Sequence, residues 1–140
     1  MIKLNLTHEF NSQDIRDYAA PGLIYKAHSH WPFSTRESIV VFEEDDRDIN
    51  LALVVLNNVL ISIDFDGTVY PVSLEWLHEY RQSIEDQNPG MADTYLCDVT
   101  KSIINYLYRT LDDRLKNSNR PSLVSENGDG LKKETSPAKV

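Results

Sequence analysis

The sequence is poor in the residues that build disulfides, thiolate metal sites and phosphate-binding loops. It has one cysteine, Cys97, which excludes an internal disulfide and a cysteine-based metal site. Its five glycines are scattered and form no glycine-rich phosphate loop. No run approaches the roughly 18 apolar residues of a membrane-spanning helix, and the N-terminal residues lack the basic-then-apolar layout of a signal peptide. We therefore expect a soluble protein of the reducing cytoplasm, without membrane contact.

Basic side chains are also scarce. The chain holds 14 lysines and arginines against 22 acidic residues, a net charge of −8. Residues 116–140 contain five basic and three acidic residues, so residues 1–115 carry −10. Such a surface repels nucleic acid and attracts basic partners, and no basic patch with interleaved aromatic residues is present. Direct binding of nucleic acid is therefore not expected, and the acidity serves either a basic partner or solubility alone.

The longest apolar stretch, residues 51–72, contains two hairpin-turn patterns. Its many β-branched residues favour strands. Asn57-Asn58 and Asp66-Gly67 suit the positive φ of two-residue hairpin turns. We therefore predict three consecutive antiparallel strands, over 49–56, 59–65 and 68–72.

The remaining elements are predicted from periodicity and capping residues. Alternating polarity favours a strand over 2–10, and short apolar runs suggest strands over 23–27 and 37–42. Asn11 and Asp14 suit the start of a short helix over 12–20. Ser73 is a good N-cap for a helix that Asn88-Pro89-Gly90 would end, and a longer helix is expected over 93–115.

These elements predict an α+β fold. We expect an antiparallel β-meander sheet of four to six strands, with two C-terminal helices packed on one face and a short N-terminal helix. Residues 1–116 would form one α+β domain. Residues 117–140 are polar, rich in Gly, Pro and Ser, and aperiodic, so we predict a disordered tail there.

One short string has the composition of a catalytic site. Asp64-Phe65-Asp66-Gly67-Thr68 follows an apolar strand and resembles the first motif of the haloacid-dehalogenase superfamily. The resemblance implies a Mg²⁺-dependent phosphotransferase or phosphatase, with Asp64 as nucleophile and Asp66 as general acid/base. The same residues also suit a hairpin turn. That interpretation assigns them no catalytic role and no cofactor.

Two histidines are weak candidates for metal ligands. His28 and His30 lie on one side of an extended chain, a spacing that occurs in metal sites. The alternative is a loop with two surface histidines, because the sequence places no third ligand beside them. Cys97 lies on the predicted long helix, where an inert, partly buried thiol is expected.

The strongest functional pattern is an acidic run of five carboxylates. It comprises Glu43, Glu44, Asp45, Asp46 and Asp48. Burying unpaired carboxylates costs several kcal/mol each, so the run should be exposed. Trp31 and Phe33 could supply the apolar part of a contact, since aromatic residues dominate binding hot spots. We therefore predict a non-enzymatic adaptor or inhibitor whose partner is a basic protein, with a nucleic-acid-handling protein as one candidate; the alternative is a solvated loop.

Overall fold

The computed structural model describes residue 2 and residues 4–116, the last five by their backbone alone. The predicted disordered tail, residues 117–140, lies outside the described residues. The single-domain assignment for 1–116 stays a prediction.

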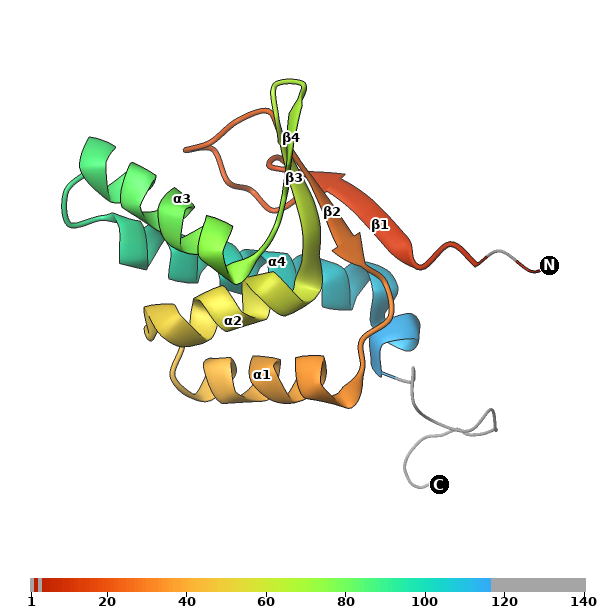
Figure 1. The fold of residues 1–140 in the computed structure, drawn as a ribbon. Coiled ribbons are helices and arrows are strands. Elements are labelled where there is room, and N and C mark those ends of the chain that lie inside the picture. Colours follow the sequence, from red (N-terminus) through yellow and green to blue (C-terminus); the bar gives the residue numbers. More distant parts are fainter. Residues whose placement is uncertain (1, 3, 117–140) are drawn as a thin grey trace.

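The fold is α+β, as predicted, with a four-stranded antiparallel sheet in the order β1-β2-β3-β4 (Figure 1). The strands are β1 (Thr7–Asn11), β2 (Leu23–His28), β3 (Leu60–Phe65) and β4 (Thr68–Pro71). The helices are α1 (Phe33–Glu44), α2 (Ile49–Val59), α3 (Leu74–Gln87) and α4 (Ala92–Lys116). The two C-terminal helices were predicted. Non-helical backbone at Leu111 interrupts α4.

The sheet has one buried and one exposed face because side chains alternate along each strand. Phe10, Tyr25 and Ile63 are neighbours across three strands, and all three are buried. The Phe10 ring contacts Tyr106 of α4, with ring centroids 4.9 Å apart. Residues on the opposite face of the sheet, such as Glu9 and Ile24, are exposed.

The hairpin turn predicted at Asp66-Gly67 is confirmed. These two residues join β3 to β4 and have φ values of 53° and 95°. Two successive positive φ angles match the twist of the flanking strands, and glycine adopts them without a steric penalty. The backbone N–H of Gly67 also donates to Oδ1 of Asp64 at 2.7 Å.

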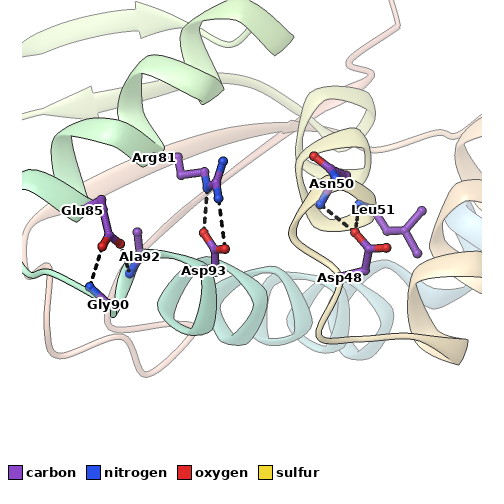
Figure 2. Close-up of polar contacts among 8 residues, drawn as sticks. All are labelled: Asp48, Asn50, Leu51, Arg81, Glu85, Gly90, Ala92 and Asp93. Carbon is purple, nitrogen blue, oxygen red and sulfur yellow. Dashed lines mark hydrogen bonds and ion pairs between the residues drawn. The ribbon is translucent and has the colours of Figure 1, made fainter.

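Two predicted strands are wrong: residues 37–42 lie in α1 and residues 49–56 lie in α2. In α1, Thr35, Ile39 and Phe42 are buried at helical spacing. In α2, five residues are buried in the core. Asp48 caps the first turn of this helix by accepting hydrogen bonds from the N–H groups of Asn50 and Leu51 (Figure 2). Burial at helical spacing therefore outweighs the β propensity of the valines and isoleucines.

The predicted turn at Asn57-Asn58 is also wrong, because both residues belong to α2. The amide of Asn58 donates to Oγ of Ser38 at 3.2 Å and thereby links α2 to α1. In the sequence, α1 and α2 lie between β2 and β3, and together they form a helical hairpin (Figure 1). Helix α2 packs on α1, α3 and α4.

The predicted short N-terminal helix over 12–20 is wrong, since the first helix of the described chain is α1. Asn11 and Asp14 do bond each other's backbone N–H at 2.9 Å, as at a helix start. The chain then leaves the helical conformation at Arg16, where φ is 58°. Oγ of Ser12 bonds the backbone at Ala20 and Leu23 instead, so local side-chain bonds replace the helical ladder.

Candidate protein-binding surface

The acidic run lies at the surface, where α1 ends and the chain connects to α2. Glu43 and Glu44 are the last residues of α1, and both are exposed. Asp45 is exposed, while Asp46 and Asp48 are half-buried. The predicted partner-binding acids thus lie within one short segment, from the last turn of α1 to the start of α2.

Two of these acids have structural partners. Asp48 caps α2, with its Oδ1 accepting from the N–H groups of Asn50 at 2.9 Å and Leu51 at 3.3 Å. Oδ2 of Asp46 lies 3.5 Å from Nζ of Lys101 on α4. Such half-exposed ion pairs contribute little stability. Glu43, Glu44 and Asp45 are therefore the carboxylates most available to a partner.

Helix α4 brings two further carboxylates to the same place. Asp46, Asp93 and Asp98 line one small cavity of about 120 Å³, together with Cys97 and Lys101. We call Glu43, Glu44, Asp45, Asp46, Asp48, Asp93 and Asp98 the acidic surface. Asp93 accepts both hydrogen bonds of the Arg81 guanidinium, at 2.6 and 3.0 Å (Figure 2), so its charge is largely compensated.

The acidic residues around Cys97 affect the pKa of its thiol. Burial raises the pKa of its thiol, and the charges of Asp93, Asp98 and Asp48 raise that pKa further, against the opposing effect of Lys101. A thiol with a raised pKa is a poor nucleophile at neutral pH. Its surroundings therefore give Cys97 the character of an inert thiol beneath an acidic surface.

The outer side of α1 carries apolar side chains that lead to the acidic surface. Phe33 is 64% exposed, Val40 52% and Val41 42%. Their positions, i, i+7 and i+8, place them on one side of the helix, which we call the α1 stripe. Glu37 and Glu44 lie on the same side by spacing and are exposed. The two valines were not predicted from the sequence, although helical periodicity over 33–44 would have indicated them.

Trp31 does not belong to this surface, because it is only 1% exposed. Its indole N–H donates to the carbonyl oxygen of His28 at 3.1 Å. Its ring meets Tyr108 of α4 edge-on, with centroids 5.8 Å apart. A buried indole whose N–H is satisfied is a core residue, so of the two predicted aromatic contacts only Phe33 is accessible.

Asp64 and Asp66 lie on the antiparallel β3–β4 hairpin rather than at the end of a parallel strand. The parallel sheet implied by the resemblance to the haloacid-dehalogenase motif is thus absent from the described residues. The carboxylate of Asp64 instead accepts from Gly67 and closes the turn. The turn interpretation accounts for both aspartates.

His28 and His30 are exposed on either side of the buried Ser29. Within residues 2 and 4–116, no group of three or more His, Cys, Asp and Glu side chains is arranged to hold a metal ion. His8, by contrast, contacts Tyr106 of α4, with Nε2 2.9 Å from the phenol oxygen. Among the described helices, none is both long and apolar enough to cross a membrane.

Comparisons of the chain with protein-family models, curated proteins and solved structures found no match. We therefore infer the function from the surface itself.

Proposed function

We propose that the protein is a non-enzymatic binding module, an adaptor or inhibitor, that docks on a basic protein through the acidic surface and the α1 stripe. The observation that carries the proposal is that the exposed apolar residues of α1 lead directly into exposed carboxylates. Fixed negative charge raises the rate at which a basic partner associates. Exposed apolar side chains then slow its dissociation, because their burial is favourable.

The chemistry of this surface defines the class of partner. A basic amphipathic segment can place lysines or arginines against Glu43, Glu44 and Asp45 and its apolar side against Val40 and Val41. Proteins that handle nucleic acid carry such basic segments, and the net charge of −10 over residues 1–115 favours them over acidic competitors. We also propose a cytoplasmic location, with which a buried free thiol is compatible.

The charge component is tested by a triple variant, Glu43→Gln, Glu44→Gln and Asp45→Asn. It spares Asp46 and Asp48, which have structural roles. The matched control, Glu75→Gln, Glu79→Gln and Asp86→Asn, removes equal charge from exposed positions of α3. The full chain first captures its partner from native host extract, and association of the purified pair is then measured by stopped flow at several salt concentrations.

We expect the triple variant to associate about tenfold more slowly than the wild type at low salt, and the control to change the rate less than about twofold. The difference should shrink as salt screens the charges over about 8–10 Å. The proposal would be contradicted if the association rate were the same for the wild type and the triple variant and did not change with salt concentration.

The apolar component is tested by Val40→Ser with Val41→Ser. Val69→Ser serves as the control, because Val69 is 56% exposed but lies on β4. We expect the double variant to dissociate faster while its association rate stays close to wild type. Equal dissociation rates for the wild type and the double variant would show that the α1 stripe is not part of the interface.

A further inference from the structure

A second surface of this acidic protein has the opposite character. A cavity of about 550 Å³ lies between the turn that follows β1 and the middle of α4. The turn contributes Arg16 and Asp14, and α4 contributes Arg109 together with polar side chains. Two arginines from segments far apart in the sequence thus line one cavity.

Neither arginine is neutralised by an ion pair. Among the described side chains, the basic groups in ion pairs are Arg81 and Lys101. Arg109 makes one long hydrogen bond, from Nε to the carbonyl oxygen of Asn105 at 3.4 Å. The nearby carboxylate of Asp14 is engaged with the backbone N–H of Asn11 at 2.9 Å. The ionised residues lining the cavity sum to +1, whereas residues 1–115 as a whole carry −10.

The backbone at Arg16 is in the left-handed region, with a φ of 58°. Glycine adopts this conformation without the steric cost of a Cβ atom. The turn is held by the reciprocal bonds of Asn11 and Asp14, by the buried side chain of Ile15, and by the backbone N–H of Asp17, which donates to the carbonyl oxygen of Ser12 at 2.9 Å. An arginine in a strained position that would suit glycine indicates a role for its side chain.

The polar side chains of α4 complete the arrangement. Ser102, Asn105 and Arg109 line the cavity at i, i+3 and i+7, so they lie along one side of the helix. Tyr108 lines the cavity too and also packs on Trp31. Hydroxyl and amide groups beside two guanidinium forks are the donors that phosphate oxygens require.

We propose that this cavity binds a small molecule bearing a phosphate group, held between the guanidinium groups of Arg16 and Arg109. The volume of the cavity is within the range of small-molecule sites. The site has the opposite charge to the acidic surface and does not depend on the proposed function.

The test titrates the full-length, ¹⁵N-labelled protein with phenyl phosphate at constant ionic strength, and with phenol and sodium chloride as control titrants. NMR follows the backbone amides of 14–16 and 102–109 and the Nε–H groups of the two arginines. The variants are Arg16→Gly, which suits the positive φ, and Arg109→Gln. Arg47→Gln is the matched control, because it removes an exposed arginine outside the cavity. Thermal unfolding of each variant verifies that it is folded.

We expect saturable shifts with phenyl phosphate alone. Arg16→Gly and Arg109→Gln should each weaken binding at least about tenfold, the loss expected when a charged hydrogen-bonding partner is removed. Arg47→Gln should bind within about twofold of wild type. Shifts that do not saturate, or that persist unchanged in folded Arg16→Gly, would overturn the proposal.

Discussion

At the scale of single residues, three tyrosines near Asp17 have raised pKa values. The hydroxyl of Tyr95 donates to Oδ2 of Asp17 at 2.6 Å. Burial, followed by the negative charge of Asp17, raises the pKa of Tyr80 from 10.0 to about 12. Burial also raises the pKa of Tyr25 and of Tyr95. The folded protein therefore holds these phenolic protons more tightly than the unfolded chain does.

This difference predicts a loss of stability in alkali. Between pH 10 and 12 the unfolded chain releases the Tyr80 proton while the folded protein keeps it, so the free energy of unfolding falls as pH rises through that range. Tyr80→Phe should reduce the slope, and Tyr70→Phe, at an exposed position, should not. Urea unfolding at fixed pH values measures these slopes. Equal slopes for wild type and Tyr80→Phe would exclude Tyr80 from the alkaline transition.

At the scale of elements, the acidic run combines structural and available carboxylates. Asp48 accepts two backbone hydrogen bonds at the start of α2, whereas Asp45, three residues earlier, is exposed and its side chain makes no hydrogen bond to the described residues. Losing an N-cap typically destabilises a helix by about 1 kcal/mol. One short segment therefore contains both a residue required by the fold and residues free for binding.

We predict that Asp48→Ala lowers the free energy of unfolding by about 1 kcal/mol, and that Asp45→Ala changes it by less than about 0.5 kcal/mol. Urea denaturation at neutral pH compares the two variants, which remove the same charge from neighbouring positions. A loss of the same size in both would show that charge, rather than the cap, determines stability here.

The elements that were predictable have local causes. The β3–β4 hairpin follows from Asp66-Gly67, and α3 follows from Ser73, whose Oγ accepts from the N–H of Trp76 at 3.0 Å. Helices α1 and α2 were missed because short apolar segments rich in valine and isoleucine are compatible with strands as well as helices. Asp48 was assigned to the acidic run, although it also stands where an N-cap belongs.

The candidate surface was predictable only in part, for a similar reason. Exposure of the acidic residues follows from the cost of burying charge. The proximity of Asp98 to Asp46 depends on α4 packing beside the α1–α2 connection, which no local pattern indicates. Trp31 precedes α1 in a short connection, and only the tertiary fold shows that its ring packs against Tyr108.

At the scale of the whole molecule, buried contacts continue to the last part of α4 whose side chains are described. Leu107 and Leu111 are both buried. Residues 117–140 are polar and aperiodic in composition. Such segments contribute few core contacts, so the stability of the fold should depend on α4 rather than on the residues beyond it.

We predict that deleting residues 117–140 shifts the thermal midpoint by less than about 3 °C. Deletion after Tyr106, which removes Leu107 and Leu111, should abolish cooperative unfolding, because each buried leucine contributes about 2–5 kcal/mol. Differential scanning calorimetry compares both with the full chain. If deleting residues 117–140 lowered the thermal midpoint by many degrees, these residues would have to contact the folded part.

The insertion of α1 and α2 between the two central strands has a consequence for the order of folding. The β3–β4 pair closes a loop of two residues, whereas the β2–β3 pair must close one of 31 residues, from 29 to 59. The entropy lost on closure grows with loop length. Because a preformed α1–α2 hairpin shortens that loop, we infer that it forms before the central strands pair. The transition state for folding would then contain the interface between α1 and α2.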